Sequence, residues 1–209
     1  MHLYDSLYEY GEAEYVVEKS RFIAHASPVS SYDEAKQFVA DIKEEYRDAT
    51  HNVPAIICGP KQEMQWASDD GEPSGTSGLP VLKMIAAENL TNLAVVITRY
   101  FGGIKLGTGG LARAYTAAAR LGLDAAGRCE VRESSLIRYE FDYTYLSKLQ
   151  NLASDGIFDI VDPEYSDVVK AGVRCLSEDT EAVKGMMTNL TGGKAKILLE
   201  EKNIIRLKK

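Results

Sequence analysis

Two periods of apolar residues run through the chain, and together they predict a mixed α and β protein. Between residues 31 and 46 the apolar side chains repeat at helical spacing, which predicts an amphipathic helix. Its apolar positions are Ala35, Phe38, Val39, Ile42 and Tyr46. Residues 15–25 are rich in β-branched and aromatic residues and predict one strand. In a single strand, alternation would place Lys19 and Arg21 on the same face.

The middle of the chain predicts further strands and helices. Strands are expected at 52–59, at 64–68 and at 93–101, and helices at 80–90 and 110–127. The stretch LAVVITRYF at 93–101 is apolar almost without interruption, which favours a strand buried on both faces.

The pattern changes near residue 130. The remaining residues predict the order strand, helix, strand, strand, helix, strand, which is the ferredoxin-like arrangement. A hairpin is expected where the two central strands meet, near Asp167. We therefore predict two α+β domains, residues 1–130 and residues 131–209.

Composition narrows the class of protein. The formal net charge of −7 argues against a broad basic surface, so contact with nucleic acid would need a local patch. The sequence contains no apolar run long enough to span a membrane, and its first residues resemble no signal peptide, so we expect a cytoplasmic protein. Cys58, Cys129 and Cys175 are far apart and indicate buried free thiols. We expect no metal and no cofactor.

Glycine is concentrated between residues 102 and 110, where it occupies five of nine positions. The segment formally fits a dinucleotide-binding fingerprint, but it does not directly follow a strand and lacks the acidic residue of that motif. Glycines at this place could simply allow positive φ angles and close packing. They could instead form an anion cradle, because backbone N–H groups at a helix N-terminus attract phosphate or carboxylate.

Basic residues on both sides of the glycines favour the cradle. The candidate anion- or RNA-binding residues are Arg99, Gly102, Gly103, Lys105, Gly107, Gly109, Gly110 and Arg113, joined by Lys19, Arg21 and His51.

A second unusual segment, SDDGEPSGTSG at 68–78, contains Asp69, Asp70 and Glu72. Paired carboxylates can perform acid–base work, and with His51 they suggest a hydrolase as the alternative function. Such residues also form turns through local hydrogen bonds, and the carboxylates could pair with arginines of the glycine segment and join the two loops. The turn interpretation needs fewer assumptions.

Four segments together carry a family resemblance: KSRFIAH, DATHN, SDDGEPSGTSGLPVL and VVITRYFGGIKLGTGGLARAY. They resemble the signature blocks of the IMPACT family, in particular its bacterial two-domain branch of the YigZ/YvyE type. The blocks lie between residues 19 and 115, and the ferredoxin-like tail fits the second domain of that branch.

The resemblance implies a first domain similar to domain IV of elongation factor G, a ribosomal-protein-like βαβ fold. It also implies a ferredoxin-like second domain. In eukaryotic relatives the IMPACT domain takes part in translational control through protein partners of a stress kinase. We therefore expect a non-enzymatic binding protein whose partner is RNA, the ribosome or a translation-linked protein, and a protein–protein adaptor remains an alternative.

Overall fold

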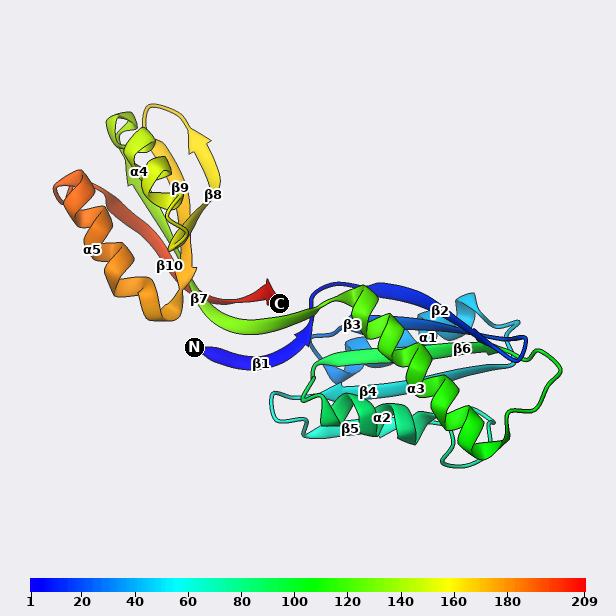
Figure 1. Cartoon of the computed structure of the whole chain (residues 1–209). Helices are drawn as coiled ribbons and strands as arrows, with labels where there is room; N and C mark the ends of the chain where they lie inside the picture. The colour runs from blue at the N-terminus through cyan, green and yellow to red at the C-terminus, as the bar shows by residue number, and fades with distance from the viewer. The chain divides into compact units, whose positions relative to one another are not determined.

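A computed structural model describes residues 1–209 and divides the chain into two compact units. One unit contains Tyr4–Glu130 and Arg206–Lys209, and the other contains Met1–Leu3 and Val131–Ile205. The chain passes from one unit to the other within three strands, β1 (His2–Leu7), β7 (Arg128–Phe141) and β10 (Lys196–Lys208). The result is a mixed α/β architecture with two units (Figure 1). None of the helices has the length and apolar character needed to cross a membrane.

The larger unit is built on a five-stranded sheet in the order β2-β3-β6-β4-β5, with antiparallel neighbours throughout. Its strands are β2 (Gly11–Val17), β3 (Ser20–Pro28), β4 (His51–Cys58), β5 (Met64–Ala67) and β6 (Leu93–Tyr100). Its helices are α1 (Tyr32–Glu45), α2 (Gly78–Ala87) and α3 (Gly107–Ala126).

Helices cover both faces of this sheet, as the apolar run in β6 predicted. Val95 and Ile97 of β6 pack into one core together with α2 and α3. Their neighbours Ala94 and Val96 point the other way and pack against α1. A strand whose alternate residues both meet a helix layer has no polar face, so its sequence shows no alternation.

The second unit has the predicted element order of strand, helix, strand, strand, helix, strand. After β7 come α4 (Leu146–Ala153), β8 (Phe158–Tyr165), β9 (Val169–Leu176) and α5 (Thr180–Thr191), then β10. A short 3-10 turn precedes each of the two helices. The sheet runs β1-β7-β9-β8, and β10 also pairs with β7. The expected hairpin is confirmed, because β8 and β9 pair antiparallel.

The beginning of the chain differs from the prediction. Residues 15–25 are not one strand, because β2 and β3 form a hairpin that turns at Glu18 and Lys19. Both residues have positive φ, 46° and 61°, as a two-residue hairpin turn requires. Such turns usually contain Asn-Gly or Asp-Gly, so the sequence did not indicate this one. Lys19 therefore lies in a turn and not on a strand face.

Candidate functional site

Two loops of the larger unit supply the residues singled out from the sequence. We call residues 68–78 the acidic loop, which connects β5 to α2. We call residues 101–110 the glycine loop, which consists of the connection from β6 to α3 and the first turn of α3. A buried ion pair joins the acidic loop to the end of β6, where the glycine loop begins. The two loops therefore share one region of the unit, but their polar groups are used in different ways.

In the acidic loop, the Asp69 carboxylate organises the start of α2. It accepts hydrogen bonds from the backbone N–H groups of Gly75, Ser77 and Gly78, at 2.7, 3.1 and 3.0 Å. The Ser77 hydroxyl also donates to it, at 2.7 Å. Burial alone would raise the pKa of Asp69, but these hydrogen bonds outweigh burial and lower the pKa below its usual range. Asp69 thus takes the place of a helix cap.

Asp70 fixes the other side of the same loop. Its carboxylate accepts from the Lys43 ammonium at 2.5 Å and from the Asn52 backbone N–H at 2.6 Å. The His51 ring places Nδ1 2.7 Å from the Asp70 carbonyl oxygen. A carbonyl oxygen can only accept, so Nδ1 carries a proton and donates it to this oxygen. The Nε2 atom lies 3.8 Å from Oε2 of Glu72.

The third carboxylate, Glu72, is buried with Arg99. Nη1 of Arg99 donates to Oε1 of Glu72 at 2.5 Å, and the Tyr115 hydroxyl donates to the same oxygen at 2.7 Å. The Arg99 guanidinium also lies over the rings of Phe22 and Phe101, 5.3 and 5.4 Å from their centroids. Arg99 is only 5% exposed. It offers no free charge to the anion-binding surface where we expected it, because Glu72 neutralises it.

Tyr115 completes this buried group from the α3 side. Burial, followed by the hydrogen bond to Glu72, raises the pKa of Tyr115 far above its ordinary value. The hydroxyl therefore stays protonated and acts only as a donor. Asp69, Asp70 and Glu72 are thus all occupied by partners inside the protein, and no group of three or more His, Cys, Asp or Glu side chains is arranged to hold a metal ion. Both oxygens of Asp69 and Asp70 accept hydrogen bonds, whereas in Glu72 the bonds from Arg99 and Tyr115 both go to Oε1.

The glycine loop needs its first glycine for close packing. A Cβ atom at Gly102 would lie 2.0 Å from the carbonyl carbon of Lys19. The Gly102 N–H donates to the Ser20 hydroxyl at 3.1 Å. Gly103 and Gly107 have positive φ, 86° and 69°, in open space. At these three positions the backbone requires glycine, either for close packing or for a positive φ. The packing of Gly102 anchors the start of the loop.

The far end of the loop is the exposed N-terminus of α3. Gly107, Thr108 and Gly109 are exposed, and no side chain caps the helix. The first turn also contains no acidic residue. The N–H groups at the start of this 20-residue helix thus face solvent with the positive end of its dipole. An arrangement of this kind attracts an anion.

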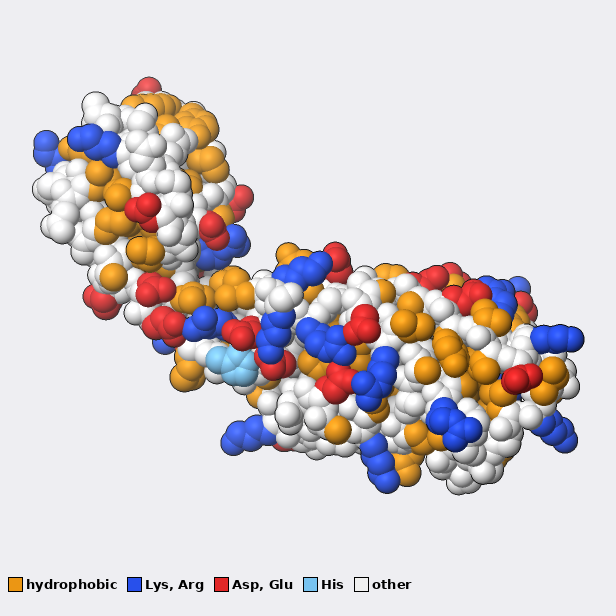
Figure 2. Space-filling model, viewed as in Figure 1, with side chains coloured by type: hydrophobic (Ala, Val, Ile, Leu, Met, Phe, Trp, Pro, Cys, Tyr) orange, Lys and Arg blue, Asp and Glu red, His pale blue; other side chains and the backbone are white.

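Exposed cations lie along the glycine loop and the first turns of α3. Lys19, Lys105 and Arg113 are exposed, and none has a carboxylate within ion-pair distance. Arg21 is exposed as well, but Glu14 pairs with it at 2.7 Å. On the face drawn in Figure 2, basic and acidic side chains alternate and no broad basic area appears. The positive region is local, as the net charge requires.

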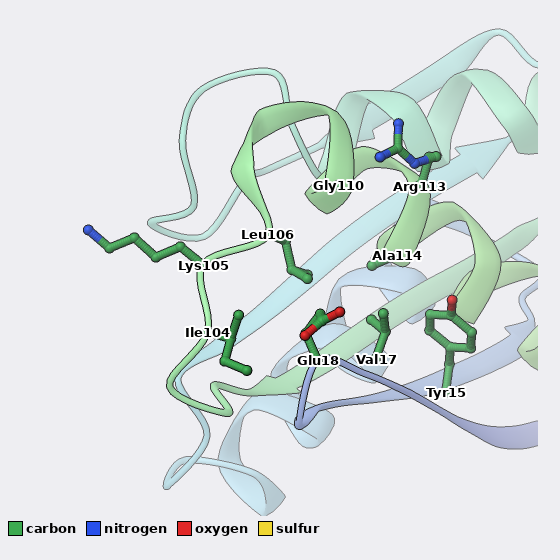
Figure 3. Close-up of a pocket in the computed structure, with 9 residues that line it drawn as sticks. All are labelled: Tyr15, Val17, Glu18, Ile104, Lys105, Leu106, Gly110, Arg113 and Ala114. Carbon is green, nitrogen blue, oxygen red and sulfur yellow. The ribbon is translucent and has the colours of Figure 1, made fainter.

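Two hollows lie on either side of Lys105 and Leu106, which line both. The first has a volume of about 520 Å³ and is lined by the end of β2, the glycine loop and the first turns of α3. Figure 3 shows that Val17, Ile104, Leu106 and Ala114 form its apolar part, while Lys105 and Arg113 extend in different directions. The two cations therefore do not converge on one point.

The second hollow, which we call the Phe101 cleft, has a volume of about 420 Å³. It lies between the two loops and is lined by Thr50, His51, Glu72, Pro73, Arg99, Phe101, Lys105, Leu106, Gly107, Thr108 and Leu111. Our reasoning from the sequence missed Phe101 and Thr108. The available signal was an aromatic residue placed directly before two glycines, at the end of a buried strand.

Comparison with known proteins identifies related families and relatives of the chain. A family model described as the Impact N-terminal domain matches residues 18–123, and one described as a domain of unknown function (DUF1949) matches residues 140–194. The chain is 42% identical to the IMPACT family member YvyE of Bacillus subtilis (strain 168) over 197 residues, which cover 94% of this chain and 91% of the relative. It is 30% identical to the IMPACT family member YigZ of Escherichia coli (strain K12) over 191 residues, which cover 88% and 92%.

A solved crystal structure of a hypothetical protein has a similar fold. It is 26% identical, has a TM-score of 0.60 and covers 95% of this chain and 97% of its own. The sequence relatives extend over both units, and the first family model includes both loops of the site. The chain therefore belongs to the IMPACT family.

Proposed function

We propose that this protein is a non-enzymatic binding protein that acts in translation by contacting RNA, either free or in the ribosome. The contact surface consists of the N-terminus of α3 with Lys19, Lys105 and Arg113. The chain belongs to the IMPACT family, and the translational control in which eukaryotic relatives of that family take part supports a link to translation. The hydrogen bonds and ion pairs that Asp69, Asp70 and Glu72 make within the protein favour a structural role for the acidic loop over the hydrolase that we considered as the alternative.

The observation that carries this proposal is the uncapped, glycine-rich start of α3, with Lys105 and Arg113 beside it and Lys19 next to Gly102, all three without ion pairs. In a chain with a net charge of −7, unpaired cations beside exposed N–H groups form a region suited to an anion. The directions in which the cations point indicate what kind of anion the region suits. Because Lys105 and Arg113 point apart, they suit successive phosphates of a strand better than one small anion (Figure 3).

The folds of the two units agree with this role. We propose that the larger unit shares the fold of domain IV of elongation factor G and that the second unit is ferredoxin-like. The strand order β10-β7-β9-β8, with both helices contributing to one core, supports the second assignment. Likeness of fold adds no evidence for a specific activity, so the surface alone carries the functional argument.

The test is binding of the full chain to single-stranded RNA and to purified ribosomal subunits over a range of salt concentrations. We expect binding to weaken steeply with salt, because phosphate contacts release counterions. A double variant, Lys105→Ala with Arg113→Ala, should bind RNA about tenfold more weakly. It should also reduce the slope of log binding constant against log salt concentration by about 2.

A matched control removes the same charge elsewhere. Lys61 and Lys83 are exposed in the same unit and have no ion-pair partner. Their double alanine variant should bind RNA like the unchanged protein. Equal weakening in both double variants, or binding that does not respond to salt, would reject the surface that we assign.

A further inference from the structure

The Phe101 cleft has an apolar and aromatic lining that contacts to phosphate do not use. Its volume of about 420 Å³ falls within the range of small-ligand sites, about 300–1,000 Å³. Apolar side chains, among them Leu106 and Leu111, form much of its lining, and an exposed aromatic ring stands at one side. Contacts to phosphate alone would not require an apolar lining or an exposed aromatic ring.

The ring of Phe101 is held in place from behind. The Arg99 guanidinium lies 5.4 Å from its centroid and 5.3 Å from the centroid of Phe22. Phe101 nevertheless remains 46% exposed. One face of the ring is therefore covered by a buried cation, and the exposed surface belongs to the rest of the ring. A flat group that stacks on Phe101 would therefore use the part of the ring that Arg99 leaves uncovered.

The polar groups of the cleft also indicate what such a flat group carries. Lys105, Gly107 and Thr108 line the cleft at the uncapped start of α3, where an anion is favoured. Arg99 lines the cleft too, and its Nε has no hydrogen-bond partner. The cleft therefore combines an aromatic surface with an edge that favours an anion.

We propose that the Phe101 cleft binds a nucleotide, with its base stacked on Phe101 and its phosphate beside Lys105 and the start of α3. Stacking on an aromatic side chain is how proteins hold unpaired bases, and it tolerates any base because every base has a π face. This inference rests on the proposed RNA contact and adds the group that is recognised. The nucleotide can come from a single-stranded RNA or from a free nucleoside 5′-phosphate.

The experiment compares three probes with the full chain: a single-stranded oligoribonucleotide, an abasic oligonucleotide of equal length and charge, and a nucleoside 5′-monophosphate. The unchanged protein should bind the oligoribonucleotide about tenfold more tightly than the abasic probe, because only the former can stack. The Phe101→Leu variant should lose that difference and keep the salt dependence. The Phe101→Trp variant should retain the preference for bases.

Trp66 provides the matched control, since it is a comparably exposed aromatic residue on β5 of the same unit. Trp66→Leu should leave the preference for bases unchanged. Melting temperatures of all variants establish that the fold is intact. Binding of the monophosphate that depends on Phe101 would identify free nucleotides as a source, while binding of the oligoribonucleotide alone would identify RNA.

The outcomes separate this inference from the proposed function. If Phe101→Leu binds the oligoribonucleotide as tightly as the unchanged protein does, the cleft does not bind a base, and the RNA contact of Lys105 and Arg113 stands. If the unchanged protein binds both oligonucleotides equally, the inference is also overturned. If no probe binds at any salt concentration, both proposals fail together.

Discussion

The acidic loop and the glycine loop lie in the same region of one unit, yet they use their polar groups in opposite ways. In the acidic loop, the carboxylates of Asp69, Asp70 and Glu72 all accept hydrogen bonds from within the protein. In the glycine loop and the adjoining helix, Lys105, Arg113 and the first N–H groups of α3 face solvent without partners. The acidic loop thus carries more charged residues than the glycine loop but presents fewer unpaired polar groups to a ligand.

This difference shows why a cluster of charged residues is weak evidence for an active site. A buried carboxylate is tolerated only where donors satisfy it, so a cluster of acids often marks a place where loops are fastened together. A surface that binds a partner must instead leave its donors unpaired in the free protein. Substitutions in the acidic loop should therefore act on stability, and substitutions in the glycine loop should act on binding.

The largest effect should follow from Glu72→Ala. Removing this carboxylate leaves the Arg99 guanidinium buried without a counter-charge and the Tyr115 hydroxyl without its acceptor. Loss of one partner of a buried ion pair costs about 3–5 kcal/mol of unfolding free energy. Urea denaturation measures this loss. Glu44→Ala, which removes an exposed glutamate in the same unit, should change stability by less than about 0.5 kcal/mol. A similarly small change for Glu72→Ala would contradict the role that we assign to the pair.

Asp69→Asn should have the next largest effect, with a clear dependence on pH. The substitution weakens four hydrogen bonds to a charged acceptor, and we expect a loss of about 2 kcal/mol at neutral pH. Because the folded protein lowers the pKa of Asp69, the carboxylate stabilises the fold above its unfolded pKa of about 3.9. That contribution disappears as the pH falls through the lower, folded pKa.

Denaturation of the unchanged protein and of Asp69→Asn at several pH values checks this prediction. The stability difference between them should shrink as the pH falls below about 3.9. Asp155→Asn, at an exposed position, should show no such change. A difference that stays constant with pH would mean that the Asp69 charge does not contribute.

Tyr115→Phe should cost less, because the ion pair remains. The variant removes one buried hydrogen bond to Glu72 and keeps the ring that packs edge-on against Phe22. We expect a loss of about 1 kcal/mol, measured by urea denaturation. The double variant with Glu72→Ala sharpens the test, since Tyr115→Phe should cost almost nothing once its acceptor is gone. Full additivity of the two losses would show that the hydroxyl acts elsewhere.

The smallest effect concerns the glycine loop and should have the opposite sign for stability. Gly109 lies in the first turn of α3, and a Cβ there would meet only Nη1 of Arg113, at 3.6 Å. Gly109→Ala should therefore stabilise the fold by about 0.5–1 kcal/mol. The added methyl group should also hinder the approach of a ligand to the helix N-terminus and weaken RNA binding severalfold. Thermal unfolding and RNA titration measure the two effects. Unchanged RNA binding would separate Gly109 from the contact surface.

Much of the fold could be predicted, because it depends on local periodicity. The helix α1 repeats its apolar residues every three to four positions, and β6 is apolar throughout because both faces are covered. The hairpin of β2 and β3 could not be predicted, because Glu18 and Lys19 adopt positive φ without the usual turn residues. The pairing of β2 with β3 on either side of the turn imposes this conformation, and such pairing cannot be recognised in a single sequence.

The site was harder to predict because it depends on contacts between distant residues. The sequence identified Glu72 and Arg99 as candidates, and pairing of the loops was one of the options considered. It could not show that the pair is buried, since burial depends on the layers formed by α3 and the sheet. Phe101 was missed for the same reason, because an aromatic residue at a strand end is ordinary until its neighbours are known.

The packing of Gly102 has a mechanical consequence for the glycine loop. Its backbone is held against Lys19 and Ser20, so Phe101, the residue before it, leads into the loop from a fixed point. Near the other end of the loop, Leu106 packs against the core of the unit. The loop is therefore anchored at both ends, which fixes the spacing between Phe101 and the start of α3. A side chain at Gly102 would meet the backbone of Lys19 and shift both.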